Sequence, residues 1–181
     1  DASGVDFGLY HGSSLSGVVF RDDGAGGGTA NSGAREGSES GVNATRVRLS
    51  SAGCALGTCD STLTDAGGEF TLWLPHGAAG MAAAVSEAQP SGWLSTGGRA
   101  GDTGGAYDRN ADQVAFTAAS GREYAGVAFG DVPRNAWVAN GARATAPGVP
   151  VAYAHTFTAS SSGAVTIAAA QSPAPPLPGW S

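Results

Sequence analysis

The sequence predicts an all-β protein, and two observations lead to this class. Glycine supplies 30 of the 181 residues, while charged residues make up only 13%. Long amphipathic stretches with a helical period are absent, whereas short runs of Val, Thr, Phe and Leu recur between glycine clusters. Short apolar runs separated by turn-forming residues are typical of the strands of a β-sandwich.

The composition also narrows the function. A formal net charge of −6 argues against a nucleic-acid partner, because binding to phosphates needs a basic face. No apolar run reaches the length of a membrane span. All nine basic residues are arginines. A P-loop, a lysine Schiff base and a Lys–Asn isopeptide bond therefore cannot form within these residues.

The stretch 17–49 is the most informative part of the sequence. A short apolar strand leads into a glycine-rich loop, and an alternating strand follows. Carboxylates stand at the start of the loop (Asp22, Asp23) and at its end (Glu36, Glu39). Glycines allow tight bends, and carboxylates supply the oxygen ligands that hard cations prefer. The loop is therefore a candidate metal site, with a solvated acidic loop as the alternative.

This order of features resembles the opening of the serine-aspartate-repeat B-type (SdrD B-like) domain, a prealbumin-like, Ig-type domain of bacterial surface proteins. Residues 32–49 follow its D-G-x-x-D-x-x-E-x-G-V-x-G-V-x-V-x-L pattern in spacing. The sequence departs from the pattern at several positions; among them, Glu36 stands for Asp, Ser32 replaces an acid and Ala44 replaces Gly. The loop after Asp23 is also several residues longer.

Further motifs of that family follow in order. Residues 64–72 resemble its T-D-x-x-G-x-Y/F turn, which makes a tight hairpin before an aromatic strand. Residues 72–77 resemble its L-P-x-G ending, and residues 90–96 resemble its P-x-G-aromatic-x-x-T segment. The resemblance covers residues 15–132 and implies an Ig-like or prealbumin-like β-sandwich at the bacterial cell surface.

The loop chemistry and the resemblance together predict calcium as a cofactor. Calcium takes six to eight oxygen ligands, so backbone carbonyls or waters would complete the set. The acids of the loop are expected to converge, helped by one asparagine and by an aspartate of the neighbouring turn. The predicted ligands are Asp22, Asp23, Asn31, Glu36, Glu39 and Asp65.

The two cysteines, Cys54 and Cys59, are predicted to form a disulfide at the tip of a hairpin. A redox or metal pair is the alternative, but the C-x4-C spacing has no further ligand nearby. A disulfide requires an oxidising compartment, which agrees with an extracellular location.

The two ends of the chain are expected to be incomplete structural units. Residues 4–9 and 126–131 carry the same F-G motif, which resembles the closing strand of tandem B-type domains. Segment 1–14 is then a closing strand without its own domain, or a donor strand; a coincidental apolar run is the alternative. Segment 133–181 resembles the first part of a DUF11-type Ig-like repeat, with alternation over 149–157 and a return strand at 164–168.

An incomplete sandwich exposes an apolar face and unpaired edge amides, which a strand donated by another copy would cover. We expect one alternating face of the first segment to insert into a groove in the last segment of a second copy. Such a contact does not close on itself and propagates as a filament. The inserted residues would be Val5, Phe7 and Leu9, and the groove residues Val151, Tyr153 and Phe157. A longer tandem-repeat polypeptide with covalently attached neighbours is the alternative.

The sequence offers little to support catalysis. No G-x-S-x-G, H-E-x-x-H or G-x-G-x-x-G motif occurs. A pair such as Asp22 with Glu39 could act as glycosidase carboxylates, but a metal loop or a solvated loop explains both acids more simply. The four tryptophans are spaced one per motif, which favours core or inter-domain anchors over a sugar-binding surface. We therefore predict a non-catalytic structural protein of a surface fibre, with an adhesin that binds a carbohydrate or a protein as the alternative.

Overall fold

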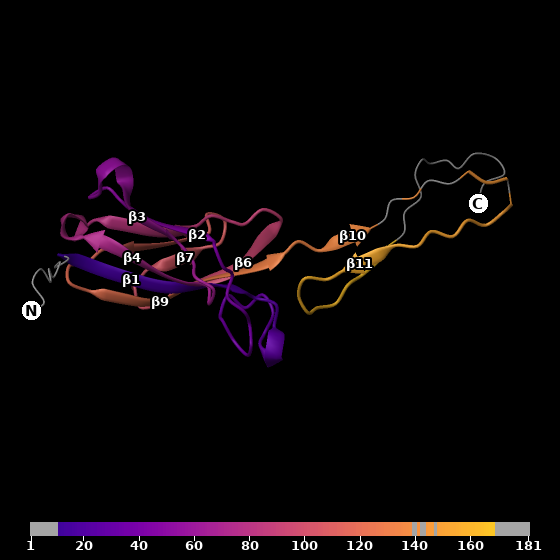
Figure 1. Ribbon diagram of the computed structural model, residues 1–181, viewed down its shortest axis with the longest axis horizontal. Helices are drawn as coiled ribbons and strands as arrows, with labels where there is room; N and C mark the ends of the chain where they lie inside the picture. The colour runs from indigo at the N-terminus through magenta and orange to yellow at the C-terminus, as the bar shows by residue number, and fades with distance from the viewer. Residues whose placement is uncertain (1–10, 139–140, 142–143, 147, 169–181) are drawn as a thin grey trace, which may run out of the picture.

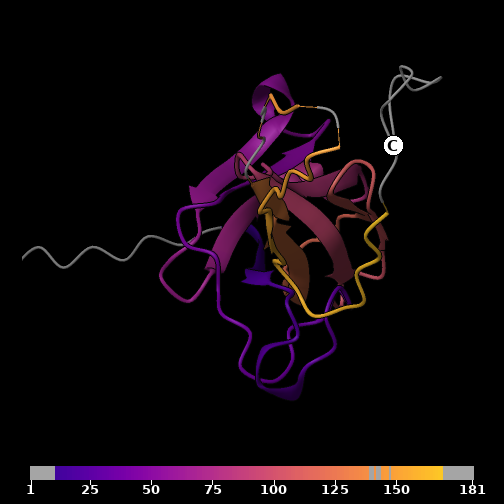
Figure 2. The ribbon, with the colours of Figure 1, turned by 90° about the vertical axis from the view of Figure 1, so that its right-hand side faces the viewer.

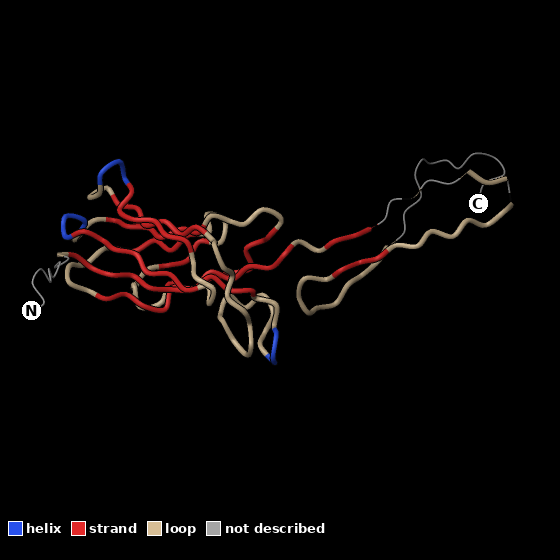
Figure 3. The backbone as a smooth tube through the Cα atoms, viewed as in Figure 1, coloured by secondary structure: helices blue, strands red, loops and turns tan. Residues whose placement is uncertain are grey.

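The computed structural model describes residues 11–138, 141, 144–146 and 148–168. Within them, strands β1 to β9 form two packed sheets, and β10 and β11 form a separate two-stranded ribbon (Figures 1 and 3). The predicted all-β class and its β-sandwich are confirmed. In the described part of the chain, no helix is long and apolar enough to cross a membrane.

The first sheet has four strands in the order β4-β1-β9-β6. β1 pairs antiparallel with β4 and parallel with β9, and β6 completes the sheet antiparallel to β9. The second F-G motif, predicted to be a closing strand, lies in β9. The strands are β1 (Gly12–Arg21), β4 (Glu69–Pro75), β6 (Trp93–Ala100) and β9 (Glu123–Pro133).

The second sheet has five antiparallel strands in the order β3-β2-β5-β8-β7. Figure 2 views the sandwich from its ribbon side. The strands are β2 (Arg46–Ser51), β3 (Thr58–Leu63), β5 (Ala82–Glu87), β7 (Ala106–Asp108) and β8 (Gln113–Thr117). Three short 3-10 turns lie outside the sheets: η1 (Ala25–Gly27), η2 (Ala55–Gly57) and η3 (His76–Ala78).

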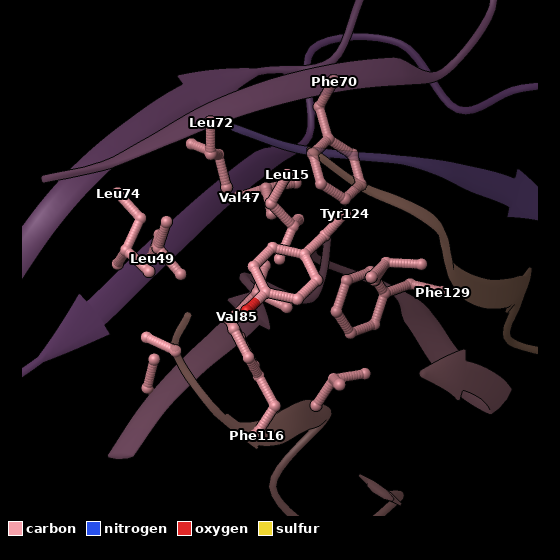
Figure 4. Close-up of a cluster of buried hydrophobic side chains, with 14 of the residues drawn as sticks. Leu15, Val47, Leu49, Phe70, Leu72, Leu74, Val85, Phe116, Tyr124 and Phe129 are labelled. Carbon is pink, nitrogen blue, oxygen red and sulfur yellow. The ribbon is translucent and has the colours of Figure 1, made fainter. Parts of the chain in front are cut away.

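The core lies between the two sheets and follows from alternation along each strand. In β4, Phe70, Leu72 and Leu74 are buried, whereas the residues between them are exposed. Successive side chains of a strand point to opposite faces, so every second residue reaches the other sheet. Side chains from both sheets meet there (Figure 4). Burying one large apolar side chain stabilises the fold by about 1.5–3 kcal/mol.

The turn at residues 64–69 differs from its prediction. A hairpin was expected, but β3 pairs with β2 in one sheet and β4 pairs with β1 in the other. The turn therefore carries the chain between sheets. Asp65 Oδ1 accepts hydrogen bonds from the N–H groups of Gly67 and Glu69, both at 2.8 Å. Gly68 has a φ of 77°, and a β-carbon there would collide with the backbone of β1, so this position requires glycine.

Cys54 and Cys59 form the predicted disulfide, with an S–S distance of 2.01 Å. The bond closes the tip of the hairpin between β2 and β3, which pair antiparallel. The enclosed turn η2 places Leu56 fully in solvent. The disulfide packs against the edge of the core, while the apolar side chain of the turn that it encloses does not.

The ribbon is shorter than the sequence predicted. β10 (Ala136–Val138) pairs antiparallel with β11 (Thr156–Thr158). In the described part of the predicted strand 149–157, only the last two residues belong to β11, and the predicted return strand 164–168 is not a strand. A two-stranded ribbon has no second layer against which a longer alternating strand could bury one face, which explains the difference.

Candidate metal centre

Three carboxylates that are distant in the sequence meet at one end of the sandwich. Glu87 is the last residue of β5, Asp112 lies in the turn between β7 and β8, and Asp131 belongs to β9. One oxygen from each lies within 4.8 Å of those of the other two. Their exposed fractions are 7%, 9% and 0%, so all three are buried. Together they form the carboxylate cluster.

Neighbouring polar side chains hold two members of the cluster in place. The Tyr107 hydroxyl donates to Asp112 Oδ1 at 2.8 Å, and the Ser95 hydroxyl donates to the same oxygen at 3.2 Å. The Gln89 amide donates to Asp131 Oδ1 at 2.8 Å. In each aspartate, Oδ1 therefore accepts a hydrogen bond from a neighbouring side chain, whereas Oδ2 does not.

Four buried oxygens of the cluster have no hydrogen-bond partner among the described residues. They are both carboxylate oxygens of Glu87, Oδ2 of Asp112 and Oδ2 of Asp131. A buried acceptor without a partner costs about 1–3 kcal/mol, and more when it is charged. The cluster therefore requires a proton or a cation to offset this cost.

The electrostatics of the cluster lead to the same conclusion. Burial, followed by the charges of Asp131 and Asp112, raises the pKa of Glu87 to about 10. Burial also raises the pKa of Asp131 to about 6, although the Gln89 amide and the Glu87 carboxyl group work in the opposite direction. Three negative charges cannot share this site without compensation. The three carboxylates could hold a metal ion, since oxygen ligands from Asp and Glu suit hard cations.

Asp22, a predicted ligand, lies next to the cluster but is fully hydrogen-bonded. Its carboxylate accepts from the N–H groups of Ser32 and Gly33, at 3.0 and 2.8 Å, and from the Thr96 hydroxyl at 2.6 Å. These donors come from the glycine-rich loop and from β6. Asp22 thus ties the loop to the sheet.

The other loop acids are also occupied by the loop itself. Asp23 forms an ion pair with Arg21 at 2.7 Å. Glu36 Oε2 accepts from the N–H of Thr29 at 3.0 Å. Glu39 accepts from two backbone N–H groups of the loop, one through each carboxylate oxygen, at 2.9 and 2.8 Å. These carboxylates shape the loop by satisfying its backbone amides.

The structure does not bring the six predicted ligands together. Asp65 bonds its own turn, and Asn31 is exposed with a φ of 60°. Within the described residues, the carboxylate cluster is the one group of three acidic, histidine or cysteine side chains whose ligand atoms lie within 4.8 Å. None of the six belongs to it. Calcium binding by the loop remains a prediction, while the grouping that can hold a metal lies beside it.

A signal for the cluster was present in the sequence. Ala83, Val85 and Glu87 occupy alternate positions of β5, so the alternation that buries the first two also directs the glutamate inward. Phe129 and Asp131 have the same relation in β9. An acid on the core-facing side of an apolar strand needs a partner. What the sequence could not indicate was that Asp112 would join them from a turn.

The predicted assembly residues are only partly described. Val5, Phe7 and Leu9 lie outside the described residues. Val151 and Phe157 are half-buried and Tyr153 is 44% exposed. In the ribbon and the residues just before β11, Trp137 lies 5.4 Å from His155 and 6.2 Å from Phe157 between ring centroids, and His155 lies 6.5 Å from Tyr153. These four residues, Tyr153, His155, Trp137 and Phe157, form the aromatic row.

No family model matches the chain, and no curated protein matches it.

Proposed function

We propose that the chain is a non-catalytic structural unit of an extracellular fibre or stalk on a bacterial surface. The observation that carries this proposal is the parallel pairing of β1 with β9. Their register runs from Ser14 beside Glu123 to Arg21 beside Asp131. β1 is the first strand of the sandwich and β9 is the last.

Parallel neighbours place the start of one strand and the end of the other at opposite ends of a sheet. The chain therefore enters the sandwich at Gly12 and leaves it at Pro133, at the far end (Figure 1). Tension applied to the two ends would load the β1–β9 hydrogen bonds in shear, so that many bonds must break together. This arrangement suits a unit that is linked in series with others.

The disulfide supports an extracellular location, because such bonds persist in oxidising compartments. Lysine is absent from the sequence, so a Lys–Asn isopeptide bond cannot stiffen the unit. We propose that a bound calcium ion stiffens the unit instead, because the donors available in the carboxylate cluster are carboxylate oxygens. End-to-end strand donation between copies, from Val5, Phe7 and Leu9 to the ribbon, is part of the same proposal.

A pulling experiment tests the structural role. Handles attached at positions 11 and 134 load β1 and β9 in shear, whereas handles at positions 12 and 75 peel the antiparallel pair of β1 and β4 one bond at a time. We expect the first geometry to need a several-fold higher unfolding force in single-molecule measurements. Equal forces in the two geometries would remove the main argument for a load-bearing unit.

The aromatic row favours a second candidate function, an adhesin-type domain that recognises a carbohydrate. Its rings lie 5.4 to 6.5 Å apart along the ribbon, and Trp137 is 47% exposed. Exposed aromatic faces stack on apolar faces of ligands. Glycan-array binding that is lost in Trp137→Ala and kept in Trp73→Ala, which alters a tryptophan exposed to a similar extent, would support this function.

A further inference from the structure

We infer that Glu87, Asp112 and Asp131 bind one calcium ion, which cross-links the two sheets at the end where the chain leaves the sandwich. This inference rests on the proposed use of calcium and assigns its position. Glu87 and the turn carrying Asp112 belong to the five-stranded sheet, and Asp131 belongs to the four-stranded sheet. One ion would thus join three segments from both layers.

The unpartnered oxygens are the evidence for a ligand. Glu87 is 7% exposed, its carboxylate faces the two aspartates, and no N–H or O–H group of the described residues outside the cluster donates a hydrogen bond to either of its oxygens. One oxygen of each aspartate is likewise unpartnered. A cation between them would satisfy four buried oxygens at once. The charges that act on Glu87 are the negative charges of the two aspartates, so a cation placed between the three carboxylates is strongly favoured.

The donor set and its spacing fit calcium. All the ligand atoms are carboxylate oxygens, whereas zinc and copper prefer sulfur and nitrogen ligands. The oxygens lie within 4.8 Å of one another, inside the roughly 5 Å that separates two ligands on opposite sides of a calcium ion. Magnesium demands a regular octahedron with shorter bonds and keeps several waters. Carboxylates from three separate segments match the more tolerant ion.

Neighbouring polar side chains orient the ligands, and one of them reaches a cleft. Tyr107 and Ser95 fix one oxygen of Asp112, and Gln89 fixes one oxygen of Asp131. Such outer contacts set the direction of the free oxygens. Ser95 also lines a cleft of about 450 Å³ that lies between the sandwich and the residues beside the ribbon. Waters or backbone carbonyls would complete the six to eight ligands of calcium.

The position links the ion to the segment that follows the sandwich. Asp131 stands two residues before Pro133, and the chain then continues into β10. Asn135 Oδ1 accepts from the backbone N–H of Ser160 at 2.9 Å, and Arg21 donates to the carbonyl of Ser160 at 3.4 Å. An ion that fixes the end of β9 would therefore also fix the base of the ribbon.

The test compares thermal unfolding at pH 7.5 in EDTA and in millimolar calcium, together with calorimetric titration by calcium. We expect one site per chain and a rise in Tm of about 5–10 °C when calcium is at a hundred-fold excess over Kd. Magnesium at the same concentration should give a clearly smaller rise. An unchanged Tm and no titration signal, or an equal response to magnesium, would overturn the assignment.

Two variants locate the ion. Glu87→Gln and Asp131→Asn keep the shape of the side chains, and Gln or Asn can donate to the remaining carboxylates. We expect both variants to fold, to have a higher Tm than the wild type in EDTA, and to lose the calcium-dependent rise. Glu123→Gln, which alters an exposed acid in β9, is the matched control and should keep the full rise.

Loop variants separate this inference from the broader calcium proposal. Asp23→Asn and Glu36→Gln change predicted loop ligands and retain a side-chain oxygen for the backbone bonds seen in the structure. If the calcium response survives in these variants and vanishes in Glu87→Gln, the cluster is the site. If it vanishes in the loop variants and survives in Glu87→Gln, the ion sits in the loop; the assignment to the cluster is then wrong, although the proposed calcium dependence stands.

Discussion

The backbone N–H of Asp22, the residue that follows β1, donates to the carbonyl oxygen of Asp131 in β9 across 3.0 Å, so two fully buried aspartates lie side by side. Their carboxylates have opposite environments. That of Asp22 accepts three hydrogen bonds, two from backbone N–H groups. That of Asp131 has one donor and leaves Oδ2 unpartnered among the described residues. One aspartate organises the fold, and the other is available for a ligand.

The first prediction concerns the structural aspartate. Asp22→Ala removes the acceptor for Ser32, Gly33 and Thr96, and it leaves the buried N–H of Gly33 without a partner, whereas the Thr96 hydroxyl keeps the Gly130 carbonyl as an acceptor. Hydrogen bonds to a charged group contribute about 1.5–3 kcal/mol each before the site relaxes. We expect the free energy of unfolding to fall by about 3 kcal/mol in urea denaturation. Thr96→Val, which removes a single donor, should cost clearly less, and equal losses for the two variants would contradict this account.

The second prediction concerns the disulfide. The loop between Cys54 and Cys59 is short, so its closure restricts the unfolded chain only modestly. Replacing both cysteines by serine should lower the free energy of unfolding by about 2 kcal/mol. The hairpin lies in the five-stranded sheet and contributes no cluster ligand, so the calcium response should be unchanged. A double variant with wild-type stability would show that the bond is not a source of stability.

The third prediction is a pH dependence of the calcium-free protein. The pKa of Glu87 rises from 4.5 to about 10, and that of Asp131 from 3.8 to about 6, chiefly through burial. A raised pKa means that the folded state binds protons more tightly than the unfolded state. The resulting stability is complete below about pH 4 and is lost as the pH rises through 6 toward 10. In EDTA, the urea midpoint should therefore be higher at pH 5 than at pH 8.

Calcium should reverse much of this loss, because metal binding displaces protons from the ligands and strengthens as they ionise. The stabilisation by calcium should thus be larger at pH 8 than at pH 5. Glu87→Gln removes the most strongly shifted group, so its urea midpoint in EDTA should vary less with pH. A wild type whose EDTA midpoint rises between pH 5 and pH 8 would contradict the expected direction of the pH dependence.

The sequence was sufficient for the sandwich but not for its site. Short apolar runs between glycine-rich turns indicated strands, because these are local properties. The partner of a strand is not local, so the turn at residues 64–69 was predicted as a hairpin although it crosses between sheets. The acids of the glycine-rich loop were conspicuous in the sequence, yet in the fold their carboxylates accept hydrogen bonds from backbone N–H groups of the loop. The cluster depends on three segments that meet only in the folded protein.

The fourth prediction tests assembly of copies end to end. The first ten residues lie outside the described residues, but Val5, Phe7 and Leu9 alternate as a donated strand requires. Phe157 of β11 and Val151, which precedes the ribbon, are half-buried, so part of their apolar surface can still contact a partner. We expect the purified chain to form concentration-dependent oligomers in sedimentation velocity, and Phe7→Asp to prevent them. Asp6→Asn changes the opposite face of the same segment and is the matched control.

Mixing two variants distinguishes strand donation from unrelated contacts between copies. Phe7→Asp damages the donated strand and leaves the groove intact, whereas Phe157→Asp damages the groove and leaves the strand intact. Each variant alone should therefore be monomeric. An equimolar mixture should form dimers and nothing larger, because one intact strand can enter one intact groove and no further contact is available. A mixture that stays monomeric, or a wild type that stays monomeric at all concentrations, would exclude the donated strand.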